Sequence, residues 1–196
     1  LKKVLLKLEA IFKGLVKDGL RKEEITKIKN QYISDETVIE VNKFLNKGEL
    51  IGYPTEAVYG LGCDPWNKES VNKISKLKGR SPDKPFLMVI SSTDQLEDLV
   101  DVSSLTDKVW KSWPGHTTWL IKAKDSVPSW MKDKQTGKVG IRMSEHPVVV
   151  DLCNLFKKPL ISTGANISGK SEIKDPSLFK KTFMTEIKYL VDGRLG

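Results

Sequence analysis

The run that decides the fold is Ile51-Gly52-Tyr53-Pro54-Thr55-Glu56-Ala57-Val58-Tyr59-Gly60-Leu61-Gly62-Cys63-Asp64. Apolar residues from Leu50 to Tyr53 predict a short strand, which Pro54 stops because proline has no amide hydrogen to donate. Thr55 then offers a hydroxyl at a strand end, where α/β sheets present their ligand sites. Gly60 and Gly62 allow another group to approach the backbone closely. We therefore expect a binding turn here, with an ordinary strand-to-helix turn as the alternative.

On either side of this run, helical patterns alternate with short apolar strands. Asn67 is a candidate N-cap, and Pro147 suits a first helical turn. Ser92 with Gln95 resembles a capping box, and Ser103 is expected to open a helix that reaches Trp110. Helices are expected at 37–46, 67–78, 103–110, 148–156 and from Asp175-Pro176, and strands at 50–53, 86–90, 117–123, 139–142, 160–163 and 189–191. This order predicts an α/β sheet covered mostly by helices.

The composition is ordinary for one globular domain. The chain has 196 residues, of which 39% are hydrophobic and 30% charged. No apolar run approaches the roughly 20 residues that a membrane span needs, and no secretory signal is recognisable. Cys63 and Cys153 stand far apart without a CxxC partner, which disfavours a metal or redox site and fits a reducing cytoplasm.

The positive charge is concentrated at the amino-terminal end. Residues 1–34 hold nine basic and four acidic residues, so they carry +5 of the total net charge of +8. Apolar residues recur there at helical spacing, with lysines opposite: Val4, Leu5, Leu8, Ile11, Phe12, Leu15 and Val16. We expect a basic helical extension, 1–34, followed by one domain, 35–196. The extension is a packing helix, an addition foreign to the domain, or a basic helix that docks tRNA or a protein partner.

Basic and polar groups follow later segments. Lys78 and Arg80 flank Gly79 at a predicted helix end, where two cations would also simply complement the helix dipole. Arg80 has the planar fork that suits a carboxylate or phosphate. The turn Trp113-Pro114-Gly115-His116 precedes a strand and would expose backbone amides to an anion. His116 and His146 are expected to be exposed, His146 at a helix start.

One pattern indicates a different chemistry. Residues 164–171, Gly-Ala-Asn-Ile-Ser-Gly-Lys-Ser, satisfy the phosphate-loop pattern GxxxxGK[ST]. Such a loop must open a helix, yet Asp175 and Pro176 interrupt the chain soon afterwards. A permuted phosphate-loop protein, with Asp192 as a magnesium ligand, stays open as an alternative. It predicts that Lys170→Ala abolishes nucleotide binding and that Arg80→Ala does little.

Taken together, the ordered segments resemble the YrdC/TsaC family, the threonylcarbamoyl-AMP synthases. Lys78-Gly79-Arg80 resembles the family's KxR element, and Trp113-Pro114-Gly115 with Thr118 its PGPxT turn. Residues 140–147 resemble its VRxxxHP segment, and residues 162–169 its STSANxSG segment. The resemblance covers roughly residues 37–196 and implies a twisted, open, mixed sheet with helices on its faces and a basic cleft.

The resemblance also implies an activity. It is the synthesis of L-threonylcarbamoyl-AMP and pyrophosphate from L-threonine, bicarbonate and ATP, for threonylcarbamoyladenosine in tRNA. By resemblance, Lys78 and Arg80 meet the substrate carboxylate and phosphates and are the candidate catalytic residues. The implied substrate-binding residues are Thr55 and Tyr59 for threonine, and Thr118, Arg142, Asn166, Ser168 and Arg194 for the nucleotide. Magnesium is expected on the triphosphate, held mainly by phosphates and water, with no dedicated protein ligands.

The chain departs from the family pattern at several positions. Ala57 stands where many members have threonine, His116 replaces a proline, and Gly164 replaces a serine. Relatives usually continue beyond Gly196, so a shortened chain is expected. A non-catalytic RNA-binding or ribosome-maturation protein is the alternative function, with binding that weakens steeply with salt. An O-carbamoyltransferase of similar fold is a further alternative.

Overall fold

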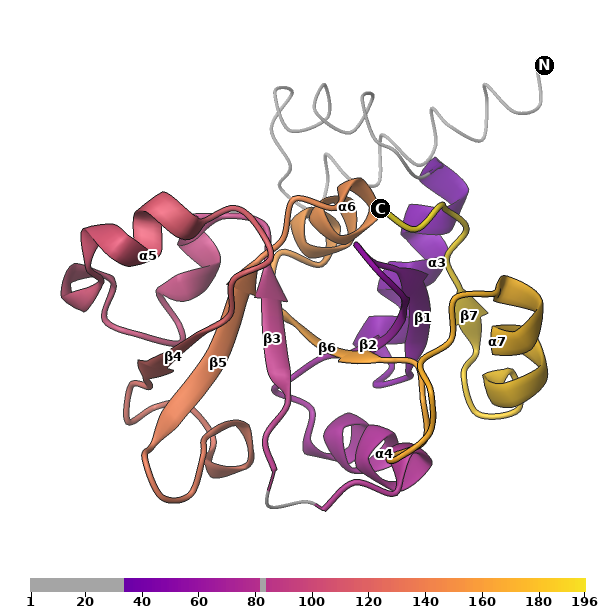
Figure 1. Ribbon diagram of the computed structural model, residues 1–196, viewed down its shortest axis with the longest axis horizontal. Coiled ribbons are helices and arrows are strands. Elements are labelled where there is room, and N and C mark those ends of the chain that lie inside the picture. The colour runs from indigo at the N-terminus through magenta and orange to yellow at the C-terminus, as the bar shows by residue number, and fades with distance from the viewer. Residues whose placement is uncertain (1–33, 82–83) are drawn as a thin grey trace.

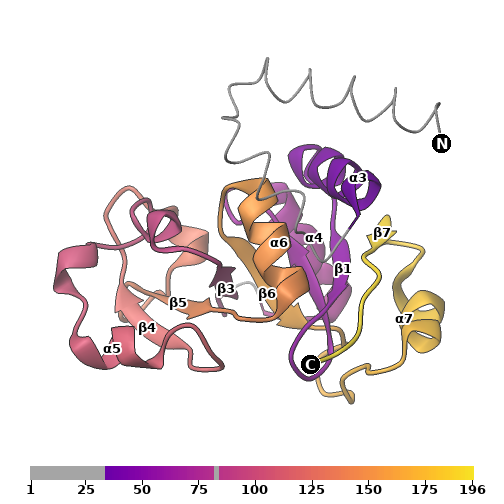
Figure 2. The ribbon, with the colours of Figure 1, turned by 90° about the horizontal axis from the view of Figure 1, so that it is seen from above.

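The computed structural model describes residues 34–81 and 84–196. The predicted extension, 1–34, lies outside the described residues except for Ser34. Figure 1 shows one twisted sheet with β4, β5 and α5 at one end and β1, β7 and α7 at the other, and Figure 2 shows the same separation from above. The fold is therefore the open α/β sheet that the alternating pattern predicts.

Seven strands form this sheet in the order β4-β5-β3-β6-β2-β1-β7. The pairs β1–β7 and β3–β5 are parallel, and the other neighbours are antiparallel. The sheet is thus mixed. The strands are β1 (Ile51–Pro54), β2 (Tyr59–Cys63), β3 (Leu87–Ile90), β4 (Trp119–Lys122), β5 (Lys138–Met143), β6 (Leu160–Gly164) and β7 (Tyr189–Leu190).

Helices cover both faces of the sheet. One face packs against α3 (Asp35–Asn46) and α6 (Pro147–Phe156), with Leu45, Tyr53 and Leu152 in a shared core cluster. The opposite face packs against α4 (Lys68–Lys78) and α7 (Pro176–Phe183), with Ile74 and Phe179 in a second cluster. A third cluster joins β4 and β5 to α5 (Asp107–Ser112) and to the 3-10 turns η1 (Thr93–Leu96), η2 (Val102–Ser104) and η3 (Ser129–Met131).

The deciding run folds as a hairpin. The predicted strand is confirmed as Ile51–Pro54. The alternative of a strand-to-helix turn is wrong, because the turn at residues 55–58 leads into a second strand, Tyr59–Cys63, antiparallel to the first. The glycines make this pairing possible. A Cβ at Gly62 would lie 2.7 Å from Cε1 of Tyr53 and 2.8 Å from the backbone oxygen of Ile161. Tyr53 therefore lies across the neighbouring strand where only glycine leaves room for its ring.

Local capping signals locate most helices correctly. Asn67 caps α4 through its contact with the Ser70 amide, and Asp175 caps α7 through the Leu178 amide. Pro147 begins α6. The helix expected at 103–110 is wrong, since the 3-10 turn Val102–Ser104 and a separate α5 stand in its place.

Two further predictions are wrong. Ser92 makes no side-chain cap; instead the Gln95 side-chain oxygen accepts from the Ser91 amide at 2.9 Å. The phosphate-loop alternative fails because residues 165–175 form a loop and α7 begins only at Pro176, so Lys170-Ser171 does not open a helix. None of the described helices is long and apolar enough to cross a membrane.

Candidate active site

Lys78 organises the loop that follows β6. Its ammonium lies 2.5 Å from the Gly164 carbonyl oxygen, and 2.7 Å from both the carbonyl and the side-chain oxygen of Asn166. The Ser168 amide donates to the Lys78 carbonyl at 2.8 Å. One residue at the end of α4 thereby fixes residues 164–168 through its side chain and its backbone. The structure thus brings together three of the predicted site residues.

The Lys78 side chain is almost fully buried, at 3% exposure. Burial, with the nearby Arg80 cation as a smaller cause, lowers the pKa of Lys78 from 10.5 to about 8, while Glu172 opposes the shift. Burying a cation costs free energy unless hydrogen bonds satisfy it, and here three oxygens do so. The loop geometry is therefore linked to the charge of one ammonium group.

Arg80 holds the segment that leads into β3. Its Nε donates to the Lys84 carbonyl at 3.2 Å, and its Nη2 donates to the Pro85 carbonyl at 3.0 Å. The guanidinium also lies over the Phe86 ring, 4.7 Å from the centroid. Partial burial lowers the pKa of Arg80. These contacts orient a planar cation, which retains further N–H groups for a ligand.

Tyr59 of β2 contacts the same loop, whereas Thr55 lies in the turn after β1 and donates its hydroxyl to the Val58 carbonyl at 2.7 Å. The Thr55 methyl would lie 3.0 Å from a Cβ at Gly60, and Gly60 pairs with Gly164. The Tyr59 carbonyl accepts from the Ala165 amide at 2.7 Å. The Tyr59 ring, however, packs beside Phe179 in the core under α7, and burial raises its pKa. Tyr59 therefore supports the loop through its backbone.

Thr118 and Arg142 form a second group. Arg142 donates from Nε to the Thr118 hydroxyl at 3.1 Å. Arg142 of β5 pairs with Val89 of β3, which in turn pairs with Leu160 of β6, and directly paired residues point to the same face of a sheet. Side chains alternate between faces along a strand, so Gly164, four residues after Leu160, shares that face. Arg142 therefore lies on the same face as Gly164, two strands and four residues away, a separation of ~16 Å at the usual strand spacings. Such a distance suits the two ends of an extended substrate.

A third group includes residues that the sequence analysis missed. Ser144 donates to the Glu56 carboxylate at 2.6 Å, and Nε2 of His146 lies 3.1 Å from the Arg194 carbonyl oxygen. His146 is buried at 4% exposure, so the prediction that it is exposed is wrong, although it does cap α6. His116 is exposed as predicted. The Gly196 amide donates to the Thr55 carbonyl at 3.1 Å.

These contacts fix residues 191–196 beside the hairpin turn. They place the Arg194 backbone near Thr55 and leave its side chain exposed. The sequence His146-Pro147 indicated only a helix start. The partner of the His146 ring, the Arg194 carbonyl, lies 48 residues away along the chain. Only a family comparison of the carboxy-terminal segment would have signalled this contact.

Metal and thiol chemistry have little support in residues 34–81 and 84–196. That part contains no group of three or more His, Cys, Asp or Glu side chains placed to hold a metal. Cys63 and Cys153 are both buried and free, and burial raises the pKa of Cys153 to about 12. The polar groups that converge are hydroxyls, amides and cations, which suit charge stabilisation and positioning.

The sequence of residues 43–195 matches the family model of Sua5, YciO and YrdC, which is described as telomere recombination. The chain belongs to the Sua5/YciO/YrdC family. Its relatives include the threonylcarbamoyl-AMP synthase of Methylococcus capsulatus, 38% identical over 154 residues, which are 78% of this chain and 82% of that protein. The threonylcarbamoyl-AMP synthase of Vibrio campbellii is 42% identical over 67% of this chain and 72% of its own length.

Solved structures of the family share this architecture. Sua5 of P. abyssi in complex with L-threonine superimposes with a TM-score of 0.75 at 28% identity, over 84% of this chain and 49% of Sua5. The present chain therefore spans about half the length of that Sua5. YciO of E. coli gives a TM-score of 0.74 at 21% identity, over 85% of this chain and 82% of YciO, which supports the fold alone.

Proposed function

We propose that this chain synthesises L-threonylcarbamoyl-AMP from L-threonine, bicarbonate and ATP, and that the product serves threonylcarbamoyladenosine formation in tRNA. The observation that carries the proposal is the 37–42% identity to proteins named threonylcarbamoyl-AMP synthase over most of the chain. The likeness to a Sua5 bound to L-threonine supports threonine as a substrate. A non-catalytic RNA-binding role is not favoured by these relatives.

The chemistry requires positioning more than acid–base catalysis. The threonine ammonium first loses a proton, and the resulting amine attacks the carbon of bicarbonate. Water leaves, and the product is a carbamate. A carbamate oxygen then attacks the α-phosphorus of ATP, and the bond to the β-phosphate oxygen breaks to release pyrophosphate. The second step gathers negative charge around the α-phosphorus, so preorganised cations and N–H groups lower its barrier. The candidate site provides these groups.

We assign roles from the contacts. Lys78 holds residues 164–168 and thereby presents Asn166 and Ser168 to the nucleotide. Arg80 supplies a guanidinium beside this loop for a carboxylate or phosphate. Thr55 borders the threonine side. Thr118 and Arg142 serve the far end of ATP, and Arg194 approaches from the carboxy-terminal segment. Tyr59 acts through its backbone.

Magnesium enters with ATP, bound to phosphate oxygens and water. We place the activity in the cytoplasm, where charged nucleotides and tRNA are available.

Pyrophosphate release tests the proposal. The wild-type chain should release pyrophosphate from ATP only with both L-threonine and bicarbonate. Asn166→Ala should lower kcat/KM by about 10- to 1,000-fold, as the loss of one transition-state donor typically does, and Arg142→Ala should lower it through weaker binding of ATP. Lys170→Ala is the matched control, because Lys170 is exposed in the same loop and should leave the rate within twofold. Release independent of threonine would contradict the proposal.

A further inference from the structure

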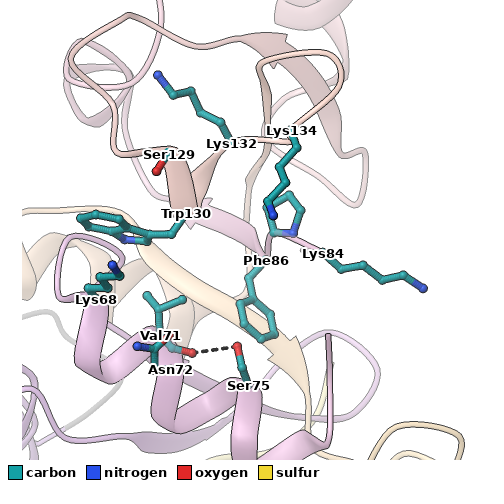
Figure 3. Close-up of a pocket in the computed structure, with 11 residues that line it drawn as sticks. Lys68, Val71, Asn72, Ser75, Lys84, Phe86, Ser129, Trp130, Lys132 and Lys134 are labelled. Atoms are coloured by element: carbon teal, nitrogen blue, oxygen red, sulfur yellow. Dashed lines mark hydrogen bonds between the residues drawn. The ribbon is translucent and has the colours of Figure 1, made fainter. Parts of the chain in front are cut away.

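A pocket of about 300 Å³ lies between α4, η3 and the segment that enters β3 (Figure 3). Pockets that bind small molecules usually measure roughly 300–1,000 Å³, so this one has room for a single compact ligand. None of the predicted site residues lines it. The pocket therefore lies outside the predicted site residues, although it adjoins Arg80 through Lys84, Pro85 and Phe86.

The rim of the pocket is strongly basic. Lys68, Lys84, Lys132 and Lys134 line it, and no acidic residue does. The nearby Asp133 carboxylate is turned to its own loop, where it accepts from the Thr136 amide and hydroxyl at 2.8 Å each. The Lys132 ammonium donates to the Lys124 and Asp125 carbonyls at 3.4 Å each, whereas the Lys68 ammonium lies over the Trp130 ring beside the pocket. The charge pattern favours a ligand with a phosphate or carboxylate.

Two aromatic rings border the same space. Figure 3 shows Trp130 and Phe86 on two sides of the pocket, with Val71 of α4 between them. The Trp130 indole is fixed because its Nε1 donates to the Pro65 carbonyl at 3.1 Å, and the Lys68 ammonium lies 5.5 Å from its centroid. A fixed, partly exposed indole is a good surface for stacking a planar ring.

Polar groups without partners complete the lining. Within the described part of the chain, the Asn72 carboxamide and the Ser129 hydroxyl make no hydrogen bond, although both line the pocket. A carboxamide offers two N–H donors and an acceptor, which can match the edge of a nucleobase. Basic, aromatic and amide groups together are the combination that recognises a nucleotide.

We propose that this pocket binds one nucleotide, with its base against Trp130, its edge at Asn72 and its phosphate at Lys68. The site goes beyond the proposed function, because it lies outside the groups assigned to catalysis. The nucleotide is either free or part of a single-stranded RNA. A bound ligand would touch Lys84, Pro85 and Phe86, which are the residues that Arg80 contacts.

The test compares the wild-type chain with Lys68→Glu/Asn72→Ala, a pair of exposed residues on α4. Lys180→Glu on α7, exposed and not part of the pocket lining, is the control for charge. The probes are AMP, followed by calorimetry, and a fluorescently labelled single-stranded oligoadenylate RNA, followed by anisotropy at several salt concentrations. Pyrophosphate release is measured in parallel and should stay within twofold in both variants.

Each outcome distinguishes the possibilities. If the free nucleotide is the ligand, the wild type binds one more AMP per chain than the double variant does. If RNA is the ligand, the double variant binds it at least tenfold more weakly and with a shallower salt dependence, while the control is unchanged. Unchanged AMP stoichiometry together with unchanged RNA affinity would overturn the pocket and leave the proposed synthase intact. Failure of pyrophosphate release in the wild type would instead contradict only the synthase.

Discussion

The ammonium of Lys78 has three oxygen acceptors and a pKa lowered to about 8. A neutral amine has only two hydrogens, so deprotonation removes at least one of these bonds. In our assignment Lys78 is a positioning residue, since its contacts are with the loop that presents Asn166 and Ser168. Its charge state should therefore be visible in the activity.

We expect the kcat/KM of the wild type to decline above about pH 8. Lys78→Arg stays charged throughout this range and should lose the decline, whereas Lys78→Met should lose at least 100-fold at every pH because the loop is no longer held. Initial rates of pyrophosphate release between pH 6.5 and 9.5 measure this. A wild-type profile that is flat to pH 9.5 would contradict the assignment.

The same shift makes stability depend on pH with a definite sign. The folded pKa of Lys78 lies below its ordinary value of 10.5, so between pH 8 and 10.5 the unfolded chain binds more protons than the folded chain. The free energy of unfolding of the wild type should therefore rise with pH in this window relative to Lys78→Met, by up to about 3 kcal/mol. Urea denaturation of both chains at pH 7.5 and 9.5 checks the difference, and a fall would contradict it.

Two glycines of the paired strands β2 and β6 should respond differently to alanine. At Gly62 a Cβ would lie 2.8 Å from the backbone oxygen of Ile161, which cannot move without disturbing the sheet. At Gly164 the nearest atom is the Glu172 carboxylate, also at 2.8 Å, at the end of a flexible side chain. Gly62→Ala should cost about 2–4 kcal/mol of unfolding free energy, and Gly164→Ala less than about 1. Equal melting temperatures for the two variants would contradict this comparison.

At the scale of elements, α7 docks on β1 through one ring. A Cβ at Gly52 would lie 2.2 Å from Cζ of Phe179, so the Phe179 ring occupies the space above that glycine. Phe179→Ala should cost about 3–5 kcal/mol, as large-to-small changes of buried aromatic residues do. Gly52→Ala should also destabilise the fold, but the double variant should be less destabilised than the sum, because the clash needs both groups. Leu178→Ala, at a side chain 49% exposed, is the control on the same helix. If the losses of unfolding free energy in Gly52→Ala and Phe179→Ala simply added up in the double variant, the contact between Gly52 and the Phe179 ring would be excluded.

The elements that the sequence predicts well are those with local causes. Asn67, Pro147 and Asp175-Pro176 mark helix starts because capping depends on neighbours three or four residues away. The strand β2 was missed because its alternating glycines indicate a turn when read alone. They become strand residues only when Tyr53 covers them from the adjacent strand.

The candidate site likewise contains contacts that could be predicted from the sequence and contacts that depend on distant segments. Residues 78 and 164–168 were identified by their resemblance to the family, and the structure brings them into contact. The pairs Glu56 with Ser144 and His146 with Arg194 were not identified. Both pairs join segments at least 48 residues apart, so no spacing or periodicity indicates them. The burial of His146 likewise depends on packing that a single sequence does not reveal.

At the scale of the molecule, residues 191–196 tie β1 to α6. The Val191 amide donates to the Gly52 carbonyl at 2.8 Å, and His146 and Thr55 bind the following residues through the Arg194 carbonyl and the Gly196 amide. A chain ending at Val191 should keep its core but raise the KM for threonine at least tenfold, because Thr55 loses its support. Arg194→Ala preserves the backbone contact and should raise this KM less than truncation does. Steady-state kinetics with circular dichroism as the folding control distinguishes the two variants, and an unchanged KM after truncation would contradict the role.

The strand order has a consequence for how the chain is made. Strand β6 lies between β2 and β3, although residues 91–159 separate it from β3 along the chain and still more residues separate it from β2. While the ribosome is still adding those residues, the nascent chain presents two strand edges with no neighbour, and unpaired edges invite pairing with other chains. The sheet closes only after Gly164 has left the exit tunnel. Synthesis speed across residues 91–160 should therefore set how much of this protein escapes aggregation, independently of the stability of its folded state.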